Sequence, residues 1–106
     1  MKDLVIKVSK IFNRERVAFV LVGAFARDLY FEKNNIKLDV RTKDIDFGIL
    51  VDTWDNFSKV KSFLKEELKM AEEAHKIYRL MYGGIPVDLI PFGKIKDGEG
   101  DIGEFF

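Results

Sequence analysis

Three aspartates have the residue type and spacing that could support chemistry. Asp44 and Asp46 are separated by one residue in the run Asp-Ile-Asp-Phe-Gly-Ile-Leu-Val, and Asp88 stands in the apolar run Val-Asp-Leu-Ile. Alternate side chains of a strand share a face, so we expect the first two carboxylates to point the same way, about 6 to 7 Å apart along the backbone. Like charges at this spacing repel unless solvent or a cation lies between them.

Clusters made only of carboxylate oxygens suit hard cations such as Mg²⁺ or Mn²⁺. If Asp88 lies on a strand beside Asp44 and Asp46, the three could hold two metal ions about 4 Å apart, as in phosphoryl transfer. Their carboxyl groups would then lie within about 4 to 7 Å of one another. A sheet with a solvated face fits the same residues, so the aspartates alone leave a structural role open.

Gly23 follows the apolar run Val17 to Val22 and precedes a helical pattern. A helix N-terminus offers backbone N–H groups and the positive end of the helix dipole, and both attract phosphate. Glycine lets a phosphate approach the backbone closely. Taken alone, Gly23 is better explained by a simple turn from strand to helix, so the order of the motifs carries more weight than this residue.

Apolar periodicity and turn residues predict the elements that would position these side chains. The fold class expected is α/β (α+β), with a small mixed sheet of about four strands and helices packed on one side. The expected elements are a helix at 3–13, a strand at 17–22, a helix at 24–31, a polar loop at 32–43, a strand at 44–51, a helix from 54 to about His75, and a hairpin of strands 77–82 and 85–90 around Gly83-Gly84.

Composition limits the classes of protein. The 106 residues suit one small domain, 47% of them are hydrophobic, and the formal net charge is zero, which argues against non-specific binding of nucleic acid over the whole surface. The absence of cysteine excludes disulfides and thiolate zinc sites. No apolar run approaches the roughly 20 residues of a membrane span, and no signal peptide is evident, so we expect a soluble cytoplasmic protein with no membrane partner.

Three segments together resemble the polymerase-β-like nucleotidyltransferase superfamily. They are Val-Leu-Val-Gly-Ala-Phe-Ala-Arg-Asp at 20–28, Thr-Lys-Asp-Ile-Asp-Phe at 42–47 and Val-Asp-Leu-Ile at 87–90. The amino-acid sequence of the second segment and its distance from Gly23 most resemble those of the AbiEii-like group. Many members of that group are toxins of toxin–antitoxin systems. The resemblance covers about residues 17–92, which we expect to be the core of one catalytic domain spanning 1–106.

The resemblance implies a nucleotidyltransferase fold and a function. The chain would transfer a nucleoside monophosphate from a nucleoside triphosphate to an acceptor, with Mg²⁺ or Mn²⁺ as cofactor and pyrophosphate as product. Asp44 and Asp46 would bind both metals, and Asp88 would complete the metal site and take the acceptor's proton. Gly23 and the amide of Ala24 would contact the phosphates.

Arg27 and Lys43 are further candidates for phosphate binding, although each is equally compatible with a solvated surface charge. The superfamily often has serine or a second glycine where this chain has Ala24, so one hydroxyl contact would be lost. We also expect the chain to be a fragment lacking a C-terminal helical region. The acceptor, such as tRNA or a protein, and any antitoxin partner are not specified by the sequence. The alternative is a non-catalytic nucleotide- or protein-binding module on the same fold.

Overall fold

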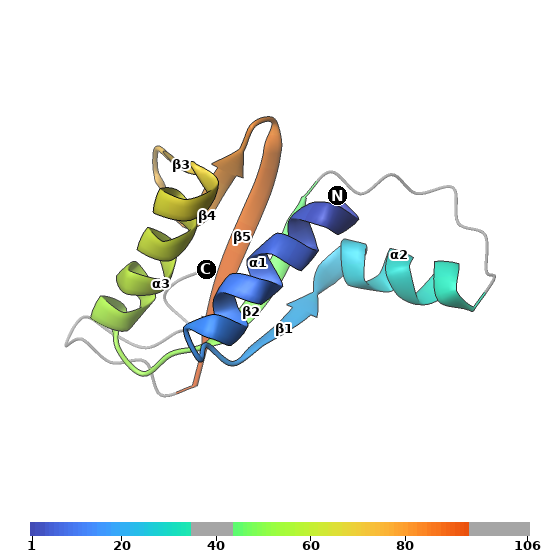
Figure 1. Cartoon of the computed structure of the whole chain (residues 1–106), viewed down its shortest axis with the longest axis horizontal. Coiled ribbons are helices and arrows are strands. Elements are labelled where there is room, and N and C mark those ends of the chain that lie inside the picture. The colour runs from blue at the N-terminus through green and yellow to red at the C-terminus, as the bar shows by residue number, and fades with distance from the viewer. Residues whose placement is uncertain (35–43, 94–106) are drawn as a thin grey trace.

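The structure is a computed structural model that describes residues 1–34 and 44–93. Its elements in chain order are α1 (Lys2–Arg14), β1 (Phe19–Val22), α2 (Gly23–Lys33), β2 (Ile45–Leu50), α3 (Trp54–Leu68), β3 (Ala71–Glu73), β4 (Lys76–Tyr82) and β5 (Ile85–Phe92). Figure 1 shows how these helices and strands are arranged in space. No helix in this described part is long and apolar enough to cross a membrane.

The five strands form one mixed sheet in the order β1-β2-β5-β4-β3. β2 and β5 are parallel at its centre, and the other neighbouring pairs are antiparallel. The hairpin of β4 and β5 turns at Gly83 and Gly84, as expected, and Gly83 has the positive φ of 58° that such turns require. The predicted α/β class is therefore confirmed.

The expected number of strands was too low because helix 54–75 was predicted too long. α3 ends at Leu68, where Lys69 adopts a left-handed conformation with φ 56° and ψ 37°. Ala71–Glu73 then pairs with β4 as the extra strand. Its residues favour helices, so pairing with an existing strand overrides local propensity here. His75 lies in the turn between β3 and β4 with φ 67°, and its expected position near a helix end was wrong.

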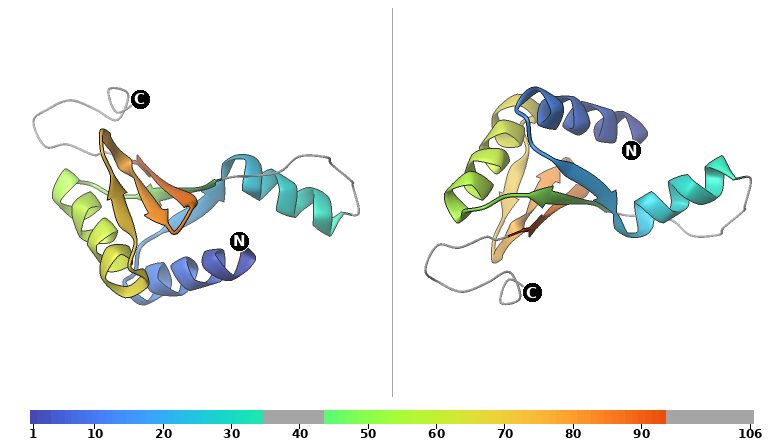
Figure 2. Two further views of the ribbon diagram at one scale, coloured as in Figure 1. Left: turned by 90° about the horizontal axis from the view of Figure 1, so that it is seen from above. Right: turned by 90° about the horizontal axis from the view of Figure 1, so that it is seen from below.

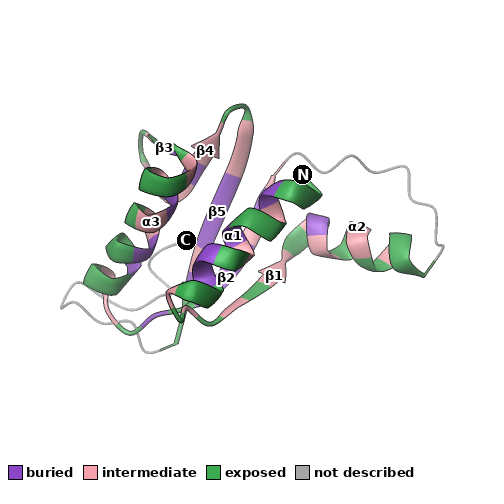
Figure 3. Cartoon of the chain, viewed as in Figure 1, coloured by how far each residue is buried: buried purple, intermediate pink, exposed green. Residues whose placement is uncertain are grey.

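One face of the sheet forms the core. Figure 2 shows α1 and α3 on the same side of the sheet, and their buried side chains pack in one cluster with those of the central strands. Figure 3 shows this burial along the inner sides of both helices and along β5. The cluster includes Phe12 and Phe47, whose rings lie edge to face with centroids 5.6 Å apart. α2 instead extends away from the end of β1.

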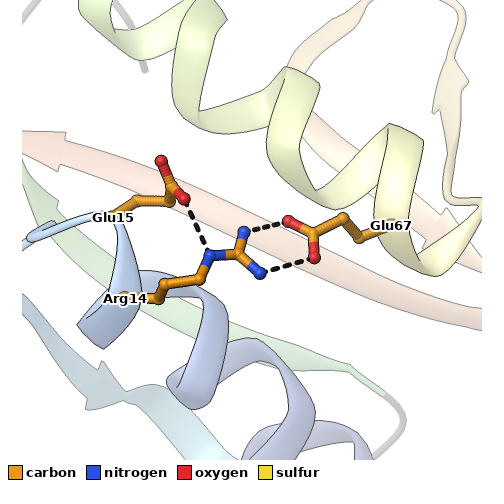
Figure 4. A network of polar contacts seen from close by, with 3 residues as sticks. All are labelled: Arg14, Glu15 and Glu67. Carbon is orange, nitrogen blue, oxygen red and sulfur yellow. Dashed lines mark hydrogen bonds and ion pairs between the residues drawn. The ribbon is translucent and has the colours of Figure 1, made fainter.

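An exposed network also connects the two covering helices. Arg14 at the end of α1 donates from Nη1 to Oε1 of Glu67 in α3 at 2.7 Å and from Nη2 to the second carboxylate oxygen, and its Nε donates to Glu15 (Figure 4). Both Arg14 and Glu67 are largely solvated, so this contact contributes less to stability than the apolar cluster beneath it.

The opposite face of the sheet is less covered. Strand alternation places Phe47 in the core and Asp46 on this open face, because successive side chains point to opposite sides. Large apolar side chains on the open face are about half exposed, with Val20 at 49% and Leu50 at 50%. The open face is therefore the side that carries Asp46 of β2 and Asp88 of β5.

Candidate metal centre

Asp46 and Asp88 lie side by side on the open face. The parallel register of β2 and β5 pairs them directly, and Asp44 immediately precedes β2, two residues before Asp46. One carboxylate oxygen from each of the three lies within 4.8 Å of the other two. The expected convergence within 4 to 7 Å is therefore confirmed as geometry.

The cluster is partly removed from water. Asp88 is 6% exposed and is the buried charged residue of the described part, whereas Asp44 and Asp46 are half-buried. Burial, followed by repulsion from the Asp44 and Asp88 carboxylates, raises the pKa of Asp46 to about 6. A bound cation would offset both the lost hydration and the repulsion between the carboxylates.

Gly23 touches the same cluster. A Cβ built on Gly23 would lie 2.3 Å from Oδ2 of Asp46, so any larger residue would displace that carboxylate. The φ of +76° at Gly23 is a second reason for glycine, since L side chains rarely adopt it. Both views in Figure 2 show the start of α2 beside the start of β2. The helix N-terminus and the carboxylates therefore adjoin one another.

Among the residues that the structure describes, no side chain caps the N-terminus of α2. Val22 occupies the N-cap position, and it has no side-chain acceptor for the first-turn N–H groups. The first turn contains no acidic residue. Ala24, the second residue of α2, is positioned next to Gly23 with its backbone amide in this turn. The local structure thus combines backbone donors with carboxylates at one place, as the sequence suggested.

Of the two basic candidates, Arg27 and Lys43, the structure describes only Arg27 and does not pair it with the aspartate cluster. Arg27 is exposed on α2, and within the described part its guanidinium pairs with Asp28 at 3.4 Å and not with the aspartate cluster. Lys43 lies outside the described residues. A hollow of about 600 Å³ lies elsewhere, between α3 and the end of β2, and shares no residue with the cluster.

Arg79 is a site residue that the sequence reasoning missed. Its Nε donates to Oδ1 of Asp88 at 2.7 Å and its Nη2 donates to Oδ2 at 3.0 Å. Arg79 and Asp88 are direct partners in the β4–β5 ladder. A two-residue turn at Gly83-Gly84 fixes this register, so the sequence contained a usable signal: opposite charges facing each other in two largely apolar strands.

The donor set fits a hard divalent cation. Three carboxylates with converging oxygens supply the ligands that Mg²⁺ and Mn²⁺ prefer, and the cluster lacks the nitrogen or sulfur ligands typical of zinc. A carboxylate offers about four lone-pair positions, so Asp88 can accept both Arg79 bonds and still contact a cation. Comparison of the chain with protein-family models, curated proteins and solved structures found no match.

Proposed function

We propose that the chain is a metal-dependent nucleotidyltransferase. The observation that carries this proposal is the convergence of Asp44, Asp46 and Asp88 within 4.8 Å, beside the glycine that begins α2. Carboxylates from neighbouring strands are suited to holding divalent cations at a phosphoryl group, and a helix N-terminus is suited to holding phosphate oxygens. Both parts are needed for a nucleoside triphosphate, and both lie at one end of β2.

In the proposed reaction, an acceptor hydroxyl oxygen bonds to the α-phosphorus of a nucleoside triphosphate. The bond from that phosphorus to the bridging oxygen breaks, pyrophosphate leaves, and the hydroxyl proton passes to an Asp88 carboxylate oxygen. A bound divalent cation would supply neutralisation of the charge on the phosphates. Asp44 and Asp46 would hold the cation, and the backbone amides of Gly23 and Ala24 would bind the phosphates.

The resemblance in the three sequence segments supports the same reaction class, and it also underlies a more specific prediction that the protein is a toxin of a toxin–antitoxin pair. The geometry bears on the reaction centre and not on the acceptor. We therefore propose the transfer reaction without assigning the nucleotide or acceptor, and the toxin role stays a prediction.

The test is transfer of label from each of four α-³²P nucleoside triphosphates, with Mg²⁺ or Mn²⁺, to separate pools of tRNA and protein. We expect label transfer with release of pyrophosphate by the wild type, and loss of both in Asp46→Asn. Asp55→Asn is the matched control, because Asp55 is an exposed carboxylate in the first turn of α3, away from the cluster. Metal-dependent nucleotide binding without transfer or pyrophosphate release would favour the binding module instead.

A further inference from the structure

A row of side chains crosses the open face of the sheet. The strand register places Asp46 beside Asp88 and Asp88 beside Arg79. Two acidic groups and one basic group are therefore neighbours on three adjacent strands. Arg79 is the cation that adjoins the cluster from the β4 side, and its side chain is only 19% exposed.

The contact between Arg79 and Asp88 constrains orientation as well as charge. Two nearly parallel hydrogen bonds, at 2.7 and 3.0 Å, fix the plane of the Asp88 carboxylate. Water competes poorly for this pair because the Asp88 side chain is only 9% exposed. The geometry of Asp88 therefore depends on a guanidinium, which a lysine ammonium could not reproduce at two oxygens.

A second carboxylate, that of Glu73, lies near the side of the Arg79 guanidinium that does not contact Asp88. Arg79 Nη1 lies 3.6 Å from Oε2 of Glu73 in β3. Among the described residues, this oxygen is the buried side-chain atom that has no hydrogen-bond partner. Buried acceptors are normally satisfied, so the positive charge of Arg79 is what compensates this oxygen.

We propose that Arg79 is the positioning residue of the metal centre, with Glu73 as its second anchor. Arg79 fixes the Asp88 carboxylate, and Glu73, which lies 3.6 Å from Nη1, holds the guanidinium from its other side. This inference rests on the proposed function, because it requires the three aspartates to bind a cation. It adds Arg79 and Glu73 to the residues that set the affinity of that site.

A merely electrostatic role for Arg79 makes the opposite prediction. A positive charge near a cation site repels the incoming ion, so removing that charge would tighten binding. A positioning role instead means that removal frees the Asp88 carboxylate and weakens binding. The sign of the change in cation affinity therefore distinguishes the electrostatic role from the positioning role. A change in fold stability would not distinguish them.

The experiment is calorimetric titration of the full chain with MnCl₂ and with MgCl₂, with circular dichroism to verify folding. Arg79→Met, which keeps an apolar stem, is expected to weaken binding about 10-fold or more, as is typical when the partner of a metal ligand is removed. Arg79→Lys, which keeps the charge without the paired bonds, is expected to weaken it as well. Glu73→Gln should weaken binding by about threefold, less than loss of the direct partner.

Glu72→Gln is the matched control for Glu73→Gln. It removes the same charge from the neighbouring residue, but Glu72 is 52% exposed and pairs with Lys61 and Lys65. Its cation affinity should match the wild type. If Arg79→Met unfolds the chain, Arg79→Lys and Glu73→Gln still decide the question.

The outcomes separate this inference from the proposed function. If the wild type binds neither cation, the metal centre and the role of Arg79 both fail. If the wild type binds a cation and the Arg79 variants bind it equally or more tightly, the positioning role alone is overturned. Equal affinities for Glu73→Gln and Glu72→Gln would overturn the part assigned to Glu73.

Discussion

Replacing Asp46 with asparagine is expected to stabilise the metal-free protein while removing its response to Mg²⁺. The pKa of Asp46 is raised from 3.8 to about 6 by burial and by the neighbouring carboxylates. A raised pKa means that the folded chain holds the proton more tightly than the unfolded chain does. The ionised carboxylate therefore costs stability, and asparagine keeps its shape without its charge.

The size and pH range of the effect follow from this shift. Each pK unit is worth about 1.4 kcal/mol, so the shift corresponds to about 3 kcal/mol before solvent screening. Because Asp46 is partly exposed, we expect the variant to gain about 1 to 2 kcal/mol at pH 8. The wild type is relieved of this cost below pH 3.8, where the unfolded group is also protonated, and carries it in full above about pH 6.

Urea unfolding in EDTA at pH 8 and pH 4, followed by the fluorescence of the single tryptophan, Trp54, measures the difference. We expect a gain at pH 8 that largely disappears at pH 4. Adding Mg²⁺ at pH 8 should stabilise the wild type by RT ln(1 + [Mg²⁺]/Kd) and leave Asp46→Asn unchanged. A variant that is less stable than the wild type at pH 8 in EDTA would refute the reasoning. Asp55→Asn should keep the response to Mg²⁺.

Two further pairs of substitutions, each a test with its control, examine the packing around the site and under the sheet. Gly23→Ala is expected to lower the free energy of unfolding by about 1 to 3 kcal/mol, because Gly23 has a positive φ and a Cβ there would meet Asp46. Gly84→Ala is the control: a Cβ at Gly84 meets nothing within 4 Å, so thermal unfolding should change little. Equal losses in the two variants would contradict the account. Phe47→Ala is expected to cost about 3 to 5 kcal/mol in urea unfolding, because Phe47 is fully buried. Phe92→Ala, at 41% exposure on the open face, should cost much less, and a reversed order would mean that the core is wrongly placed.

Local patterns in the sequence predicted the parts of the site that depend on neighbours along the chain. The alternation in Ile45–Leu50 indicated which face Asp46 occupies, and Gly83-Gly84 indicated the hairpin. Both signals arise from the two-residue period of strands and from turn geometry, which act over a few residues. The same turn fixed the pairing of Arg79 with Asp88, although that consequence was overlooked.

Longer-range features could not be obtained in this way. The parallel pairing of β2 with β5 joins residues about forty positions apart, such as Asp46 and Asp88, and no turn connects them directly. Their proximity was a prediction from chemistry and resemblance. The end of α3 was missed for a related reason, since residues after Lys69 favour a helix and become a strand only through pairing with β4.

The distance between Gly23 and Asp46 is also a tertiary property. The sequence placed a glycine at the start of a helix, but it did not show that a side chain there would collide with a carboxylate on the next strand. The antiparallel register of β1 with β2, which pairs Val22 with Asp46, produces this contact. Gly23 therefore has a steric role beside the phosphate-binding role that we propose.

Manganese-edge anomalous diffraction from crystals of the wild-type chain grown with MnCl₂ tests the central claim most directly. We predict an anomalous peak for a manganese ion bound to carboxylate oxygens of Asp44, Asp46 and Asp88. This peak should be absent from crystals of Asp46→Asn. A fully occupied manganese peak at other residues, or none at this cluster in saturating MnCl₂, would contradict the account.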